Sequence, residues 1–243
     1  MHNDSLKTLF AAVLLTIGLA LCGWFIGQGF VHSRLDDKFV TVKGVAERTV
    51  RADLAIWPMR FVATGNDLTQ VHASLDADAR KVVEFLLRHG ISREAVELQS
   101  LEVTDVMAQA YRSGPVESRF ILAQTMVARS GNVDTIAQAS QRVNELVDAG
   151  VVLSAEYGPG GPVYLFTSLN DVKPEMIAEA TLNAREAAQQ FATDSGSRLG
   201  DIRRANQGVF QILGRNDIPD LQEHKQIEKT VRVVSTIDYY LVK

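Results

Sequence analysis

Residue types that usually carry out chemistry are sparse in this sequence. It holds five histidines and one cysteine, and the cysteine, Cys22, lies inside an apolar run near the N-terminus. No intrachain disulfide and no thiolate chemistry are therefore expected in the rest of the chain. No H-E-x-x-H pair occurs, and His72 and His89 lie 17 residues apart on one expected helix, too far along its axis to share a metal ion. We predict surface or capping histidines and no metal-ligating residue.

The most conspicuous motif is the glycine- and proline-rich run from Gly158 to Pro162. A phosphate-binding loop leads into a helix, whose first N–H groups bind the phosphate oxygens. Here the strand-like sequence VYLF follows, so a tight connection between strands is expected. The chain also lacks a P-loop, the dinucleotide-binding G-x-G-x-x-G motif and the G-x-S-x-G elbow of hydrolases. No cofactor and no cofactor-binding residue are predicted.

One group of charged residues could line a polar cleft between two strands. Its members are Glu102, Asp105, Arg112, Glu117 and Arg119. Paired carboxylates in a cleft can perform acid–base chemistry, although such residues more often form a solvated face of an α+β domain. We therefore predict no catalytic residue, and the alternative of an enzyme or a small-ligand sensor that uses this cleft stays open.

Residues Thr8 to Val31 form an uncharged apolar run of 24 residues. As a helix with a rise of 1.5 Å per residue, the run would be about 36 Å long, enough to cross a hydrocarbon core of roughly 30 Å. A cleaved signal peptide is an alternative, but its apolar core is usually shorter, and no Ala-x-Ala triplet closes this run. A lipoprotein signal would need a small residue before Cys22, where Leu21 stands. We predict an uncleaved transmembrane anchor over residues 8–31.

The charges leave open which side of a membrane the remaining chain would occupy. Lys7 precedes the run and four cations follow it within residues 32–48, which by the positive-inside rule favours a cytoplasmic C-terminus. Long folded domains, however, cross membranes largely regardless of their charge. Over the whole chain 25 Lys and Arg stand against 29 Asp and Glu, without a basic stripe. Nucleic acid is therefore not an expected partner.

Three amphipathic segments predict long helices. The first spans residues 67–89, where Asp67 and Gln70 fit a capping box and Gly90 supplies a stop. Its expected buried face is Leu68, Val71, Leu75, Ala79, Val82 and Leu86. The second helix is expected over residues 133–149, with Ile136, Ala139, Val143, Leu146 and Val147 on one face.

The third helix is expected to begin near Pro174, a favoured first-turn residue, and to end at about Asp194. Its apolar face consists mainly of alanine: Ile177, Ala180, Ala184, Ala187, Ala188 and Phe191. Small side chains allow a close approach, so we expect this helix to lie tightly against a sheet or a neighbouring element.

Alternating apolar and polar residues predict strands between these helices. The expected strands cover residues 39–50, 54–64, 96–106, 119–129, 163–169, 202–213 and 231–241. Pro58 cannot donate a ladder hydrogen bond, so it indicates an edge strand or a bulge and, with it, a candidate contact surface. Residues 214–230 are expected to form an extended loop or a short helix before the last strand. The order of elements predicts an α+β fold and is consistent with a duplicated ββαββ unit.

Several short motifs, taken in order over residues 39–242, resemble the SIMPL-domain family of bacterial envelope proteins. They are Gly44 with Glu47, the turn Arg51-Ala52-Asp53-Leu54-Ala55, Gly90-Ile91 after the first helix, Ala184-Arg185 in the third, and then Gly196 and Leu199-Gly200. The resemblance implies a domain of antiparallel sheet and helices over residues 39–243, without known catalytic residues or a cofactor. It also implies an envelope location, homo-oligomers in some members and a link to oxidative-stress defence.

Together, the apolar run and the resemblance predict a single-pass protein of the bacterial inner membrane. Residues 1–7 would lie in the cytoplasm, residues 8–31 would form a signal anchor, residues 32–38 a linker, and residues 39–243 a periplasmic domain. We expect the protein to be non-enzymatic and to act as a homo-oligomer or through a protein partner of the envelope. The alternative is an envelope enzyme or a small-ligand sensor that uses the polar cleft.

Overall fold

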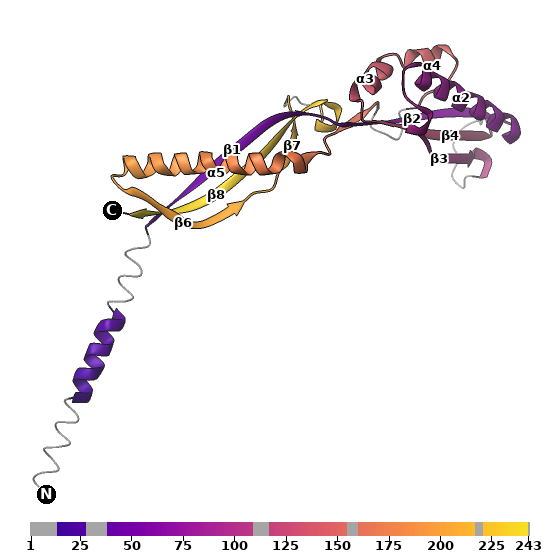
Figure 1. Cartoon of the computed structure of the whole chain (residues 1–243). Coiled ribbons are helices and arrows are strands. Elements are labelled where there is room, and N and C mark those ends of the chain that lie inside the picture. The colour runs from indigo at the N-terminus through magenta and orange to yellow at the C-terminus, as the bar shows by residue number, and fades with distance from the viewer. Residues whose placement is uncertain (1–13, 28–37, 109–116, 155–159, 217–220, 243) are drawn as a thin grey trace, which may run out of the picture. The chain divides into compact units, whose positions relative to one another are not determined.

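The computed structural model of the chain describes residues 14–27, 38–108, 117–154, 160–216 and 221–242 (Figure 1). The chain divides into two compact units. Each contains antiparallel strands and all or part of a long helix. Unit 1 comprises Met1–Ala46, Ile177–Val209 and Val233–Lys243, and unit 2 comprises Glu47–Met176 and Phe210–Arg232. The predicted α+β class is confirmed.

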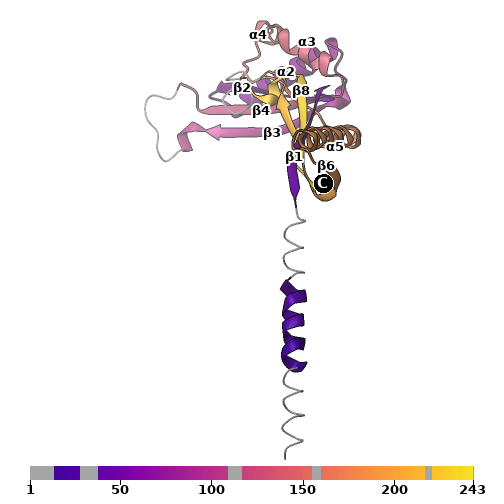
Figure 2. The ribbon, with the colours of Figure 1, turned by 90° about the vertical axis from the view of Figure 1, so that its left-hand side faces the viewer.

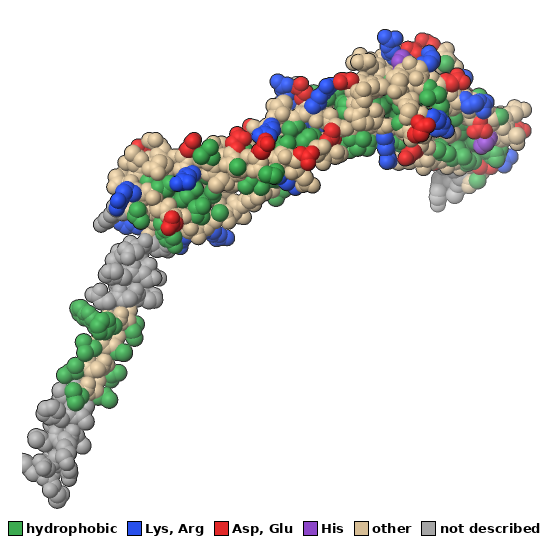
Figure 3. Space-filling model, in the orientation of Figure 1, with side chains coloured by type: hydrophobic (Ala, Val, Ile, Leu, Met, Phe, Trp, Pro, Cys, Tyr) green, Lys and Arg blue, Asp and Glu red, His purple; other side chains and the backbone are tan. Residues whose placement is uncertain are grey.

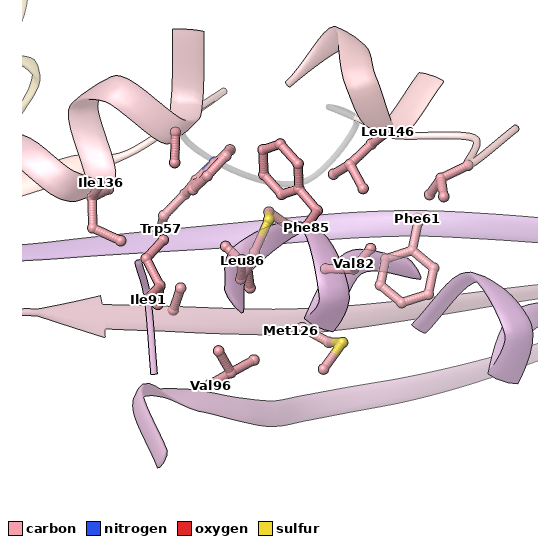
Figure 4. Packing of buried hydrophobic residues seen from close by; sticks show 14 of the residues in the cluster. Trp57, Phe61, Val82, Phe85, Leu86, Ile91, Val96, Met126, Ile136 and Leu146 are labelled. Carbon is pink, nitrogen blue, oxygen red and sulfur yellow. The ribbon is translucent and has the colours of Figure 1, made fainter. Parts of the chain in front are cut away.

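Unit 2 is built on an antiparallel sheet with the strand order β3-β4-β2-β5. Its strands are β2 (Leu54–Gly65), β3 (Val96–Asp105), β4 (Phe120–Ser130) and β5 (Val163–Leu165). The odd-numbered residues of β2 from Ala55 to Ala63 are buried beneath helices, and the even-numbered ones are partly exposed. Figure 4 shows Trp57 and Phe61 of this buried row beside Phe85 and Leu146 of the helices.

Helix α2 (Leu68–Arg88) covers the buried face of this sheet (Figure 2). Its ends follow the local signals in the sequence: the Asp67 side chain accepts a hydrogen bond from the N–H of Gln70 at 3.0 Å, and Gly90 adopts a φ of 80°. The predicted face is buried at Val71, Leu75, Val82 and Leu86. Leu68, the first residue of the helix, is by contrast 43% exposed.

The expected helix over residues 133–149 is in fact two helices, α3 (Val133–Gln141) and α4 (Asn144–Asp148). The break falls at Arg142, whose φ of −103° and ψ of 14° leave the helical region. After this change of direction Leu146 is still buried, whereas Val147 of the expected apolar face is 56% exposed. No glycine or proline marks the break, and the helical spacing of apolar residues continues across it, so the sequence predicted one helix.

Unit 1 is built on strands β1 (Phe39–Arg51), β8 (Glu228–Val242) and β6 (Arg198–Gln207), in the order β1-β8-β6. Helix α5 (Leu169–Asp194) begins five residues before Pro174, which lies inside the helix. Its buried side is formed by residues spaced four apart: Met176, Ala180, Ala184, Ala188 and Ala192. The expected small face is confirmed at three alanines, but Phe191 is 53% exposed and Ala187 is exposed as well.

Three other expectations about strands need correction. Residues 202–213 form parts of two strands, β6 and the short β7 (Gln211–Gly214), and β5 ends at Leu165. Pro58 lies in an inner strand and pairs with Val127 in an unbroken register, so it marks neither an edge strand nor a bulge. It is tolerated because β5 pairs with β2 only up to Ile56, and further backbone bonds on that side begin at Arg60.

The loop between β7 and β8 contains the short 3₁₀ helix η3 (Glu223–Lys225), as expected of residues 214–230; residues 217–220 lie outside the described part. Near the N-terminus, residues 14–27 form a helix with exposed side chains (Figure 3). Within the described ranges, no helix combines the length and the apolar character needed to cross a membrane. Three expected segments lie wholly or partly outside those ranges. They are the N-terminal tail (residues 1–7), the rest of the anchor (residues 8–13 and 28–31) and most of the linker (residues 32–37).

Candidate functional site

A groove of about 430 Å³ lies between helix α2 and strands β3 and β4 of unit 2. Ala79 and Val83 of α2 form its apolar wall, and Leu98, Gln124 and Met126 form its floor. This α2–β3 groove is open to solvent along one side, since β3 is the edge strand of the sheet order β3-β4-β2-β5. Its lining is mixed, with four apolar side chains on the wall and floor and five polar or charged ones beside them, and ligand sites likewise combine apolar surface with a few polar groups.

The rim of the α2–β3 groove carries a balanced set of charges. Asp76, Arg80 and Glu84 follow one another at one-turn intervals along α2, and Arg93 lies across from them. The Nδ1 atom of His72 lies 3.4 Å from Asp76, and Arg93 donates a hydrogen bond to the carbonyl oxygen of Val96. With two cations and two anions, the rim has no net charge.

The floor of the groove holds a buried polar side chain, Gln124, which is only 8% exposed. It stands in β4 between Phe61 of β2 and Leu101 of β3. Among the described residues, no hydrogen bond partner is found for its side-chain amide. Because its amide oxygen and nitrogen are not fully enclosed, water or a ligand in the groove can supply their hydrogen bonds.

Strand β3 extends the apolar floor beyond the groove itself. Leu98, Leu101 and Val103 pair with Met126, Gln124 and Leu122 of β4, so all three side chains lie on the helix-covered face of the sheet. They are nevertheless 60%, 46% and 54% exposed. The register shifts between Leu98 and Ser100, and this bulge lets Leu98 and Leu101 share one face despite their odd spacing.

The charged residues of the expected polar cleft do not come together. Glu102 accepts a hydrogen bond from Arg60 at 2.9 Å, whereas Asp105 is held by Arg119, with N–O distances between 2.9 and 3.3 Å. Within β3, Glu102 pairs with Ala123 and Asp105 with Phe120, so the two carboxylates point to opposite faces of the sheet.

The remaining members of the expected cleft add little to it. Glu117 is exposed in the turn before β4, and Arg112 lies outside the described residues. The hydrogen bond from Arg119 lowers the pKa of Asp105 below its ordinary value, and the same bond raises that of Arg119. Both side chains are charged at neutral pH, and each is the hydrogen-bond partner of the other. This arrangement does not suit a catalytic proton donor or acceptor.

The histidines are widely separated. His89 lies at the end of α2 with its Nε2 atom 3.1 Å from Glu145 and its ring against Phe85, at a centroid distance of 4.6 Å. His72 neighbours Asp76, and His224 belongs to η3, while the other two histidines fall outside the described residues. No three potential metal ligands gather anywhere in the part of the chain that the structure describes.

The glycine-rich motif binds a cation of the protein itself. The Nζ atom of Lys225 lies within 3.1 to 3.4 Å of the carbonyl oxygens of Gly160, Gly161 and Pro162. Partial burial lowers the pKa of Lys225 from its ordinary value. Because the described residues of this motif direct carbonyl groups inward, the local polarity is the reverse of a phosphate site. Residues 158 and 159 of the motif lie outside the described part.

Asp53 of the Arg51–Ala55 turn forms hydrogen bonds that hold the backbone in place. Its carboxylate accepts hydrogen bonds from the N–H and hydroxyl of Thr167, at 2.7 and 2.9 Å, and from the N–H of Ser168 at 2.8 Å. These groups immediately precede α5. Partial burial alone would raise the pKa of Asp53, but the bonds from Ser168 and Thr167 outweigh it and the pKa is lowered. Asp53 therefore ties the Arg51–Ala55 turn to the two residues directly before α5.

The α2–β3 groove was not expected from the sequence, because its walls come from segments far apart along the chain. One signal was present. In β4 the core-facing positions read Leu122, Gln124, Met126 and Ala128, and a single amide interrupts this apolar row. A polar residue at a core-facing position is a sign of either a hydrogen-bonded core or a binding site.

The comparisons with known proteins agree with the motifs and the fold. No curated protein matches the chain. The family model SIMPL, described as a protein of unknown function (DUF541), matches residues 40–234, which include all of unit 2 and, of unit 1, residues 40–46, 177–209 and 233–234. The chain therefore belongs to the SIMPL family.

Proposed function

We propose that this SIMPL protein is a single-pass protein of the bacterial inner membrane whose α+β domain lies in the periplasm and works by binding protein. The observation that carries the proposal is the helix at residues 14–27. Its large apolar side chains are 50% to 73% exposed: Leu14, Leu15, Ile17, Leu19, Leu21, Trp24, Phe25 and Ile26. A helix that is apolar all round is typical of a lipid or core environment.

The sequence around this helix supports the same proposal. The apolar run continues from residue 8 to residue 31, which is enough for a bilayer, although the described helix covers 14 residues. The periplasmic side and a contribution to oxidative-stress tolerance follow from what the SIMPL resemblance implies. A folded domain of this size crosses membranes whatever its charge, so the basic residues after the run do not oppose that orientation.

Edge strands with exposed apolar side chains support action through surfaces. Strand β3 exposes Leu98, Leu101 and Val103, and β6, the edge of the other sheet, exposes half of Ile202. Open sheet edges pair readily with other chains, whether another copy or a partner. We infer that such contacts, in a homo-oligomer or with an envelope protein, are how the domain acts.

The location is tested by fractionation of cells that produce the full chain. The native chain should sediment with membranes and resist extraction by carbonate. A double substitution, Leu15→Arg and Leu19→Arg, should move it to the soluble fraction, because each arginine costs about 2.5–3.5 kcal/mol at the centre of a span. The matched control, Leu182→Arg and Phe191→Arg, changes two exposed residues of α5 and should leave the protein in the membrane. Native chain in the soluble fraction would refute the anchor.

Sidedness and assembly need separate measurements. A phosphatase reporter that is active only in the periplasm, fused after Lys243, should be active, and activity of a cytoplasm-only reporter instead would reverse the orientation. Crosslinking in intact cells, followed by mass determination, should show a multiple of the chain mass of 26.7 kDa or a second protein. A strictly monomeric detergent-extracted protein without any crosslinked partner would contradict action through protein contacts.

A further inference from the structure

We propose that the α2–β3 groove binds an extended peptide segment of another protein, and that the Gln124 side chain holds one main-chain peptide group of that segment. This inference rests on the proposed function and names the kind of partner for it. Three properties of the groove support it: the unpartnered amide on its floor, the apolar row along β3 and the neutral rim.

The amide of Gln124 matches a peptide group. It offers one carbonyl acceptor and two N–H donors, and a peptide group presents one donor and one acceptor in a similar plane. The side chain is 8% exposed and has no hydrogen bond partner among the described residues. A lipid chain would leave both atoms without partners, whereas a peptide group would satisfy them together.

The apolar row on β3 sets the length of the ligand. Leu98 and Val103 lie opposite Met126 and Leu122, which are four residues apart on β4, and this corresponds to about 13 Å along a strand. Leu101 lies between them, opposite Gln124. A segment of about five extended residues would cover this row and place alternate apolar side chains on it. A small polar metabolite would cover only part of it.

The charges of the rim favour a segment without large net charge. Arg80 and Arg93 balance Asp76 and Glu84, so the groove lacks the positive potential that attracts nucleic acid or a phosphorylated ligand. The acidic residues on the opposite face of β3 are also neutralised within the sheet. Glu102 pairs with Arg60 at 2.9 Å and Glu97 with Arg129 at 3.8 Å.

The test begins with a selection that uses the full chain in detergent and a phage-displayed library of random 12-residue peptides. An enriched peptide is then synthesised with a fluorescent label, and its Kd is measured. We expect Gln124→Leu and Leu98→Asp each to weaken binding tenfold or more. The control Leu87→Asp changes a leucine of α2 that is 47% exposed and does not line the groove, so it should leave the Kd unchanged.

Gln124→Leu also separates a binding role from a structural one. Leucine has a similar volume, and the amide has no hydrogen bond to the described residues that it could lose, so the melting temperature should stay within about 2 °C while peptide binding weakens. A fall in the melting temperature by more than about 2 °C would show that the amide has a structural role in the free protein and would overturn the proposal. Failure to enrich any peptide, or equal Kd values for all variants, would do the same.

Two further outcomes identify a different occupant. If Leu98→Asp converts a detergent-solubilised oligomer into a monomer, a second copy of this chain occupies the groove, and the proposed separate partner is wrong. If enriched peptides lose affinity only for Leu87→Asp, the binding surface lies elsewhere on α2, which also overturns it. The membrane location is tested separately by fractionation, so none of these binding results supports or contradicts it.

Discussion

Gly44 of β1 lies against the backbone of Ala180 in α5, so closely that a Cβ atom at Gly44 would stand 1.8 Å from the Ala180 carbonyl oxygen. It would also come within 2.5 Å of the backbone nitrogen of Ala184. The alanines of α5 permit this approach, because any larger side chain would hold the helix away from the strand. This close packing of β1 against α5 therefore requires a glycine at position 44.

Gly44→Ala should destabilise unit 1 strongly, because the new methyl group meets backbone atoms that cannot rotate away. We expect the free energy of unfolding to fall by about 3 kcal/mol, at the upper end of the range for overpacking. Urea unfolding of the full chain in detergent, followed by circular dichroism, measures the loss.

The matched control for Gly44 is Gly131, where an added Cβ atom would be 3.7 Å from its nearest neighbour, the carbonyl oxygen of Asp53. Gly131→Ala should change the free energy of unfolding by less than about 1 kcal/mol. Equal effects of the two substitutions would show that the close packing of β1 and α5 is not the cause.

Asp53→Asn should destabilise the protein at neutral pH but much less in acid. The folded-state pKa of Asp53 lies below its ordinary value of 3.8, so its contribution is complete above about pH 5 and is lost as the pH falls through the folded value. At pH 7 we expect a loss of about 1 kcal/mol, since asparagine keeps only one acceptor oxygen for the N–H groups of Thr167 and Ser168.

Thermal unfolding at pH 7, 5, 4 and 3 checks the prediction for Asp53. The difference between the native chain and Asp53→Asn should shrink between pH 5 and pH 3. The pKa of Asp105 is lowered as well, so Asp105→Asn is the control for a second carboxylate whose pKa lies below its ordinary value. A difference that stays constant down to pH 3 would contradict a role of the Asp53 charge.

Elements whose signals are local were predictable, and those that depend on distant residues were not. Helix α2 was placed to within a residue because Asp67 and Gly90 mark its ends in the adjacent sequence. Helix α5 begins at Leu169, earlier than expected, and the residues directly before it are held by Asp53, which lies 114 residues before Thr167 in the sequence. Pro174, the local signal for its start, misled the prediction.

The candidate site shows the same division between local and distant information. The sequence identifies Gln124 as a polar residue at a core-facing position of β4, but not the groove in front of it. The groove exists because α2 covers β2 and β4 and leaves Leu98, on the next strand, 60% exposed. That outcome depends on where the helix lies over the sheet, which the alternation of residues within a strand does not encode.

The hypothesis of a duplicated ββαββ unit stays a prediction.

Lys229 of β8 has a fully buried side chain, and its ammonium group donates to the carboxylate and to the backbone carbonyl of Glu223. Glu223→Ala should destabilise unit 2 by about 1–3 kcal/mol, because it leaves a buried charge with one neutral acceptor. In the double variant with Lys229→Met the loss should be smaller, since the charge is gone as well. Urea unfolding of the three variants measures the coupling, and additive effects would contradict a direct interaction.

Pro174 in the sixth position of α5 leaves the carbonyl group of Asn170 without its usual helical N–H donor. Pro174→Ala supplies that donor at an exposed site, although it also gives the unfolded chain more freedom. Because the gain from a proline removed within a helix exceeds that entropic loss, we expect a net stabilisation of about 1–2 kcal/mol. Glu179→Ala, another exposed position of α5 without proline, is the control and should change the free energy of unfolding by less than about 0.5 kcal/mol. A destabilised Pro174→Ala variant would show that proline is needed to orient the first turns of α5.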